Sequence, residues 1–169
     1  MPSKKGFKDL AKKSCTSITK SESSLKSASY KLPSKVIKIK PSQFTNIYVR
    51  AEIKTPSSFS SGDKYKDIFL IGGTRSCDAL FGGFFKNKIF IGFQCRRWIL
   101  GPEFKENTNY LIEFDYNNVT KKATIIMNNK VIKQEVLNLK FKDGFITIGS
   151  GYHTKDAEKF NGTIKSIQI

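Results

Sequence analysis

The stretch "NYLIEFDYNNVTKKATIIMNNKVI", residues 109–132, contains segments in which apolar and polar residues alternate. Two Asn-rich turns separate these segments. Glu113 and Asp115 are two residues apart in its first half. Alternation along a strand places these two carboxylates and Asn117 on one strand face. The later "MNNK" segment is typical of a tight turn. The stretch therefore predicts two neighbouring strands and raises the question of whether the carboxylates form an active site.

Similar short strands are predicted on both sides of this stretch. Residues 46–54, "NIYVRAEIK", place Ile47, Val49, Ala51 and Ile53 on one face, which is the period of two expected of a half-buried strand. No segment beyond the N-terminal tail has helical periodicity. The pattern predicts an all-β chain folded as an antiparallel β-sandwich. The remaining predicted strands are residues 35–40, 67–73, 79–98 (two strands joined at 86–88), 109–117, 121–129, 130–139, 144–149 and 162–169.

Three glycines, at positions 82, 83 and 92, fall inside predicted strands. Glycine weakens a strand, because it offers no side chain for packing. These positions therefore indicate bulges, or places where another group comes close to the backbone.

The N-terminal residues 1–29 differ in composition from the rest. They contain seven Lys, two acids and eight Ser, with few large apolar residues. This composition is typical of a basic tail. We therefore divide the chain into a tail, residues 1–29, and one sandwich domain, residues 30–169.

The whole chain is strongly basic, with 30 Lys and Arg against 14 Asp and Glu and a formal net charge of +16. This charge predicts attraction to polyanions, such as nucleic acid, acidic glycans or an anionic membrane surface. However, 26 of the basic residues are Lys, which also occurs simply as a solubilising residue. The sequence leaves both interpretations of the charge open.

Five segments in sequence order resemble the laminin G-like and concanavalin A-like jelly-roll family. They are "QFTNIYVRAEIK", "DIFLIGG", "FGGFFKNKIFIGF", "NYLIEFDYNNVTKKATIIMNNKVI" and "KFNGTIKSIQI", and the resemblance covers about residues 30–169. It implies a jelly-roll sandwich. Two departures stand out: residues 108–110, Thr-Asn-Tyr, replace a usual Trp-His pair, and the acidic loop residues that hold calcium in many members have no clear counterpart.

The resemblance also tests the carboxylate pair. Laminarinase-type glycosidases of this superfold use Glu-x-Asp-x-Glu, in which the last Glu is the general acid. Here position 117 is Asn, and an amide cannot donate a proton as a carboxylic acid does. The only His, His153, lies in the Gly-rich "GSGYHTKD" without a recognised catalytic partner. We predict that Glu113 and Asp115 are framework and that the chain is not an enzyme.

Glycan binding is the other use of this fold, on a sheet face or at the rim loops. Sugars need aromatic platforms and polar side chains, and anionic sugars add Arg. The segment "CRRWIL" holds Arg96, Arg97 and the sole tryptophan, Trp98, and Arg75 lies before the same predicted hairpin. The arginines favour a ligand contact. Trp98 favours the core, although a ligand platform stays open for it. In the loop "GSGYHTKDAEKF", the candidate ligand contacts are Tyr152 and His153.

The three cysteines have no zinc-ligand spacing, and we predict no metal or cofactor. Cys77 and Cys95 flank the predicted hairpin and share parity, so a disulfide between them stays open, although reduced thiols are the default. The sequence contains neither a membrane span nor a recognisable signal peptide. We expect an intracellular or virion-associated protein rather than a secreted one.

Two functions compete at this stage. The first is a non-enzymatic, lectin-like module for glycans, with a preference for anionic ones. The second is a structural protein of a large or capsid-like assembly, in which the sandwich is a building block and the basic tail contacts protein neighbours or nucleic acid. Direct nucleic-acid binding through the aromatic and basic residues of 84–98 ranks third.

Overall fold

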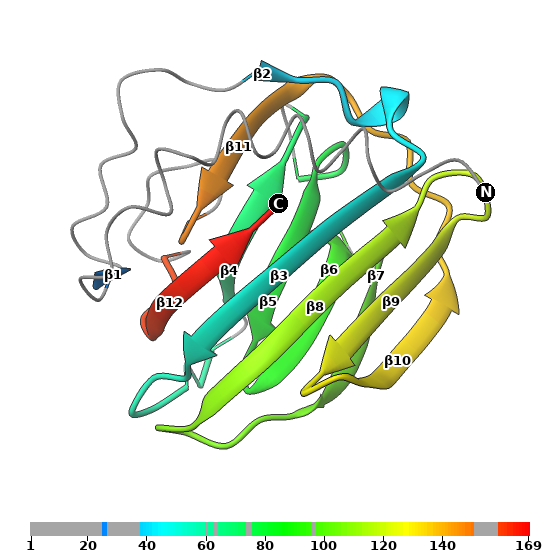
Figure 1. Cartoon of the computed structure of the whole chain (residues 1–169). Coiled ribbons are helices and arrows are strands. Elements are labelled where there is room, and N and C mark those ends of the chain that lie inside the picture. Colours follow the sequence, from blue (N-terminus) through cyan, green and yellow to red (C-terminus); the bar gives the residue numbers. More distant parts are fainter. Residues whose placement is uncertain are drawn as a thin grey trace.

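The computed structural model describes residues 25–26, 38–59, 61–62, 64–73, 76–95, 97–150 and 159–169. They form two antiparallel sheets of six strands each, which pack face to face (Figure 1). Within the described residues the only helical element is one 3-10 turn, η1 (Pro41–Gln43). The predicted all-β sandwich is confirmed.

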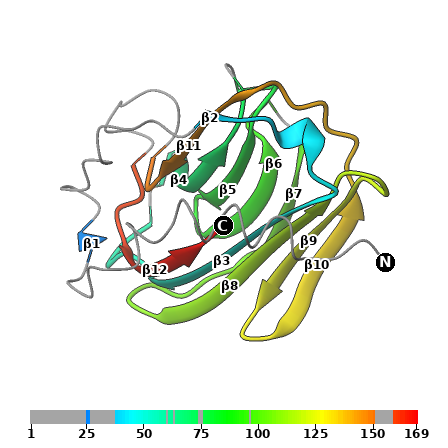
Figure 2. The ribbon, with the colours of Figure 1, turned by 45° about the horizontal axis from the view of Figure 1, so that its top comes forward.

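Each sheet combines a run of consecutive strands with strands from distant parts of the sequence, and the two layers are clear in the turned view of Figure 2. The first sheet has the order β1 (Leu25–Lys26), β12 (Thr163–Gln168), β3 (Asn46–Lys54), β8 (Asn109–Asn117), β9 (Lys122–Met127) and β10 (Lys130–Val136). The second has the order β2 (Lys38–Ile39), β11 (Gly144–Ile148), β4 (Tyr65–Ile71), β5 (Leu80–Phe85), β6 (Lys88–Phe93) and β7 (Arg97–Glu103).

Strand β3 follows the predicted alternation. Ile47, Val49, Ala51 and Ile53 are all buried, whereas the intervening side chains face away from the core. Strand β8 pairs with β3 along all nine of its residues without a register shift. A period of two along a half-buried strand therefore fixes which residues of this sheet enter the core.

The main core lies between the sheets and is rich in phenylalanine. Phe69 from the second sheet meets Phe114 from the first edge to face, with ring centroids 5.1 Å apart. Phe84 stacks on Phe160 at 5.9 Å and meets Phe104 edge to face at 5.3 Å. Burying one such ring stabilises the fold by about 1.5–3 kcal/mol, and the many buried isoleucines of the same core contribute similar amounts each.

The prediction of only two strands in residues 79–98 is wrong. The second strand, β6, ends at Phe93, the chain turns at Gln94 and Cys95, and a third strand, β7, begins at Arg97. Strand β7 contains Pro102, which has no N–H to donate. Its position at the edge of the second sheet explains how a strand can accommodate proline.

The hairpin between β5 and β6 turns within the predicted residues 86–88. Lys86 adopts a left-handed backbone there, with φ 57°. At the β9–β10 turn, by contrast, both Asn128 and Asn129 are left-handed, with φ 48° and 67°. Two positive φ angles in a two-residue turn match the twist of the flanking strands, so the tight turn predicted there is confirmed.

The strand glycines mark close approaches, as predicted. A Cβ on Gly82 would collide with the ring of Phe69. Gly92 has φ 141°, and a Cβ there would collide with the backbone and side chain of Trp98 on the neighbouring strand. The approaching groups are therefore parts of this chain.

Cys77 and Cys95 form a disulfide, with their Cα atoms 5.3 Å apart. The bond that the sequence left open is present, and the default of reduced thiols is wrong for this pair. It connects the loop before β5 to the turn before β7.

Two residues of the predicted tail, Leu25 and Lys26, pair with Ile164 and Thr163 of β12 at one edge of the first sheet. The other tail residues lie outside the described part of the chain, and the division at residue 29 stays a prediction. Among the described residues, no helix has the length and apolar character needed to cross a membrane.

Candidate functional site

The outer face of the second sheet, opposite the main core, carries a second apolar cluster. Along β5, Leu80 and Phe84 point into the main core, so alternation turns Phe81 and Phe85 outward. The buried centre of this cluster is Leu70, Ala79, Phe81 and Phe90, and the half-buried side chains around it are Tyr65, Phe85, Trp98 and Leu100. We call the rings of Tyr65, Phe81, Phe85, Phe90 and Trp98 the aromatic face.

The rings of the aromatic face pack in mutual contact. Phe85 lies 5.1 Å from Tyr65 and 5.8 Å from Trp98 between ring centroids. Phe90 lies beneath them, 5.3 Å from Tyr65 and 6.3 Å from Trp98. These spacings are those of favourable tilted and edge-to-face pairs. The half-buried rings therefore form a supported apolar surface.

Glycine makes room for Trp98 on this face. Gly92 is the cross-strand partner of Trp98, and it offers no side chain beside the indole. Any Cβ at position 92 would collide with Trp98. Trp98 can therefore take this position only because residue 92 is glycine.

A chain of hydrogen bonds holds the polar edge of the aromatic face. The indole N–H of Trp98 donates to the Tyr65 hydroxyl at 3.2 Å, and that hydroxyl donates to the Gln94 carbonyl at 2.8 Å. The Gln94 side-chain amide donates to both carboxylate oxygens of Asp67, at 2.8 and 3.0 Å. Asp67 is fully buried. These hydrogen bonds fix the half-buried rings of Tyr65 and Trp98, so the surface is preorganised.

A basic side chain borders the same face. The Lys86 ammonium lies 5.8 Å from the centre of the Phe85 ring, within the range of a cation–π contact. Arg97 is exposed at the start of β7, immediately before Trp98, but alternation along the strand turns it to the side opposite Trp98. The site therefore combines apolar rings with fixed polar groups and nearby positive charge.

Comparison with known proteins identifies the architecture. No protein-family model and no curated protein matches the sequence. The CBM40 module of the Ruminococcus gnavus IT-sialidase, bound to α2,3-sialyllactose, matches with a TM-score of 0.57 and 11% identity, over 75% of this chain and 76% of that one. The SAP-like pentraxin of Limulus polyphemus matches with a TM-score of 0.53 and 11% identity, over 73% and 62%. The chain has a concanavalin A-like jelly-roll fold.

A third jelly-roll match is a putative carbohydrate-binding protein from Bacteroides ovatus, with a TM-score of 0.54 and 20% identity. The match covers 79% of this chain but only 38% of the Bacteroides protein. The family resemblance found in the sequence is thus confirmed as a resemblance of fold.

Of the predicted ligand residues, this jelly roll brings Trp98 to the aromatic face, whereas Arg97 pairs with the inward-facing Phe93 and shares the other side of β7 with Ile99. Trp98 does not enter the core between the sheets, contrary to the favoured interpretation, because β7 turns it to the outer side with Leu100. The other four, Arg75, Arg96, Tyr152 and His153, lie outside the described residues.

Several members of the face were not predicted. Residues 79–93 are apolar at nearly every position, with no alternation of polar side chains. Such a run indicates that both sheet faces are covered. This signal could have identified Phe81, Phe85 and Phe90 as an outer cluster.

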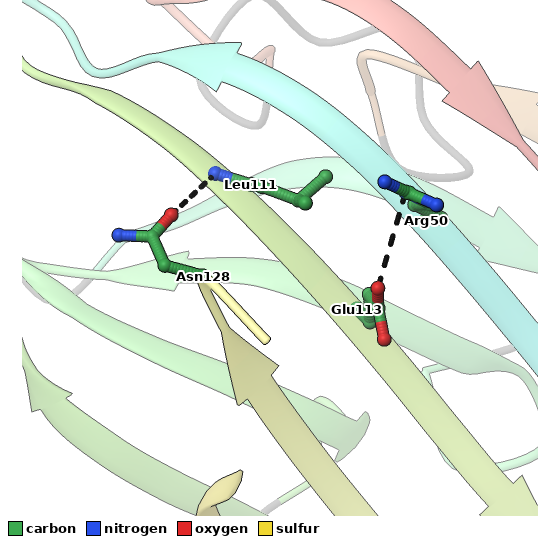
Figure 3. Close-up of polar contacts among 4 residues, drawn as sticks. All are labelled: Arg50, Leu111, Glu113 and Asn128. Carbon is green, nitrogen blue, oxygen red and sulfur yellow. Dashed lines mark hydrogen bonds and ion pairs between the residues drawn. The ribbon is translucent and has the colours of Figure 1, made fainter. Parts of the chain in front are cut away.

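The carboxylates of the opening stretch lie on the outer face of the first sheet, as alternation predicts. Glu113 faces Arg50 across β3 and β8, with Nε and Oε1 3.9 Å apart (Figure 3). Tyr48 donates its hydroxyl hydrogen bond to Glu113. Burial, followed by the charge of Glu113 and this hydrogen bond, raises the pKa of Tyr48 to about 12.

Asparagines secure the backbone at both ends of β8. At its start, the Asn128 side-chain oxygen accepts a hydrogen bond from the Leu111 N–H at 3.1 Å (Figure 3). At its end, the Asn117 oxygen accepts from the N–H groups of Val119 and Thr120, at 2.9 and 2.8 Å. Position 117, which would carry the general acid of a glycosidase, therefore caps a turn. No group of three or more potential metal ligands occurs among the described residues.

Proposed function

We propose that this chain is a non-enzymatic glycan-binding module whose ligand lies on the aromatic face. One observation carries the proposal: half-buried Trp98, Tyr65 and Phe85 form a continuous ring surface, in which Trp98 donates a hydrogen bond to the Tyr65 hydroxyl and that hydroxyl donates to the Gln94 carbonyl. A sugar ring has an apolar face that packs on aromatic side chains and hydroxyls that need polar partners. The aromatic face offers both.

The jelly-roll neighbours are consistent with this function. The Ruminococcus gnavus module is bound to a sialylated sugar, and the Bacteroides ovatus protein is described as a putative carbohydrate-binding protein. Fold alone does not determine function, so the proposal depends on the ring surface and not on the likeness.

We further propose a preference for anionic glycans. The Lys86 ammonium lies against the Phe85 ring of the aromatic face, and ammonium groups form charge-assisted hydrogen bonds with sulfate and carboxylate. Arg97 is exposed and directly precedes Trp98 in the sequence, so its guanidinium is a further candidate contact. Arg75 and Arg96, which are close in sequence to Cys77 and Cys95, stay candidates for ligand contacts. Tyr152 and His153 stay candidates for further ligand contacts.

A binding assay with three ligand classes tests the proposal: immobilised heparin, a set of neutral glycans and single-stranded DNA. We expect saturable glycan binding that becomes about tenfold weaker in Trp98→Ala, because one stacking surface is lost. Trp98→Phe keeps a ring and should stay close to the wild type. Arg97→Ala should weaken heparin binding more than neutral glycan binding.

Thermal unfolding of each variant shows whether the sandwich remains folded. One result would contradict the proposal: the protein binds heparin and DNA equally, the binding disappears when residues 1–29 are deleted, and it falls steeply with salt. That result would favour the alternative of an assembly protein with a basic arm.

A further inference from the structure

A groove of about 420 Å³ lies at one end of the sandwich, apart from the aromatic face. Three segments line it: the chain around η1, the turn between β8 and β9, and the connection from β10 to β11 (Figure 2). Small-molecule sites in proteins have volumes of about 300–1,000 Å³, so the groove could hold a ligand the size of one sugar.

Hydrogen bonds outside the sheet ladders fix the shape of the groove. The Asn118 side-chain amide donates to the carbonyls of Pro41 and Phe44, at 3.3 and 3.2 Å. The Asn118 backbone N–H donates to the Thr45 carbonyl at 2.7 Å. Asn118 thus ties the turn between β8 and β9 to the segment around η1. A groove held in this way needs little reorganisation when it binds a ligand.

The third wall is fixed through Tyr116. Its hydroxyl donates to the Leu137 carbonyl at 2.8 Å and accepts from the Leu139 N–H at 3.1 Å. The ring of Tyr116 also meets Phe141 edge to face at 5.2 Å. Leu139 and Phe141 line the groove as apolar surface, together with Phe44.

The polar lining of the groove carries only positive charge. Lys121 and Lys140 are both lining residues, and none of the lining residues, which all belong to the described part of the chain, is acidic. The Lys121 ammonium donates one hydrogen bond, to the Asn118 side-chain oxygen at 2.9 Å, and it has three donors. Ser42, Gln43 and Thr45, whose side chains carry hydroxyl and amide groups, also line the groove.

We propose that this groove is a second binding site, for a small polyhydroxylated ligand that carries one carboxylate or phosphate group. The lysines would bind the anion through charge-assisted hydrogen bonds, and the hydroxyl and amide groups would bind the ligand hydroxyls. The apolar surface of Phe44 and Phe141, which are both half-buried, would pack on the carbon skeleton. This site does not depend on glycan binding at the aromatic face.

Calorimetric titration of the full chain with glucuronate, glucose 6-phosphate and neutral glucose tests the site. We expect at least one of the two anions to bind in the millimolar range or more tightly and glucose to bind far more weakly. Comparison of the two anions shows whether carboxylate or phosphate is preferred. The single variants Lys121→Gln and Lys140→Gln should each bind the anion about tenfold more weakly than the wild type.

Two controls make the result specific. Lys122→Gln removes a charge from the next residue, which is exposed and does not line the groove, and should bind like the wild type. Trp98→Ala should also bind the anions normally, even if it loses glycan binding. Failure of both anions to bind would overturn the proposal, as would equal binding by the folded Lys121→Gln/Lys140→Gln variant. Loss of anion binding in Trp98→Ala would place the ligand on the aromatic face and would also overturn it.

Discussion

At the scale of single residues, Asn117 explains why a carboxylate-rich strand can be framework. Its side-chain oxygen accepts two backbone hydrogen bonds in the turn after β8. A glycosidase would need a carboxylic acid there with its proton directed at a ligand. On the same face Glu113 is already engaged by Arg50 and Tyr48. The sequence supplied the identity of residue 117, and the structure supplies its role.

Tyr48 gives a direct test of this framework. Its pKa is raised from 10.0 to about 12, mainly by burial and then by Glu113, because both disfavour the phenolate. The stability that the neutral phenol contributes is therefore fully present below pH 10 and is lost as the pH rises through about 12. We expect the difference in phenolate absorbance between the wild type and Tyr48→Phe to titrate near this higher value.

The same titration has an internal control. Glu113→Gln removes a negative charge beside Tyr48 and should lower its pKa only part of the way, since burial is the larger cause. If the absorbance difference between the wild type and Tyr48→Phe titrates near pH 10, the pKa of Tyr48 is not raised. Its burial and its contact with Glu113 would then be wrong.

At the scale of elements, the sequence predicted strands where apolar and polar residues alternate, as in β3, and where short apolar runs lie between turn residues, as in β5 and β6. Strand β3 alternates over its full length, and its inner residues were all named correctly. Strand β7 was missed, because "RWILGPE" contains Gly and Pro and follows a turn without a glycine signal. Its position depends on pairing with β6, including a register shift between Lys88 and Phe90, and sequence patterns do not report such shifts.

The disulfide makes a second prediction at this scale. It closes a chain segment with a sequence separation of 18, and a loop of that length corresponds to about 3 kcal/mol of unfolding free energy in the chain-entropy account. We expect reduction of the wild type by a thiol to lower its free energy of unfolding by about this amount, measured by urea denaturation.

The double variant Cys77→Ala/Cys95→Ala serves as the control. It should show the lower stability from the outset and should not respond to the thiol. Equal stability of the oxidised and reduced wild type would indicate that the bond does not constrain the chain.

At the scale of the whole molecule, the candidate site was only partly predictable. Arg97 and Trp98 stood out because Arg and Trp are rare in this chain. Tyr65, Asp67 and Gln94 did not, because they come together only through the pairing of β4 with β5 and the turn before β7, and β4 has a register shift between Asp67 and Phe69. The groove is formed by three segments distant in sequence, which no local pattern connects.

The net charge of +16 acts over the same scale. Both proposed sites have basic side chains at their borders, Lys86 at the aromatic face and Lys121 and Lys140 at the groove. A basic surface raises the local concentration of anions and speeds their association. It cannot by itself distinguish glycans from nucleic acid, and that distinction depends on the ring surface.

The most direct measurement uses the fact that Trp98 is the only tryptophan in the chain. Its indole fluorescence and its indole N–H resonance report on the aromatic face alone. On titration with a sulfated oligosaccharide, we predict a saturable change in both signals, with the same midpoint as binding measured by calorimetry. Calorimetric binding with no change in either Trp98 signal would contradict the account, because the ligand would then lie elsewhere on the molecule.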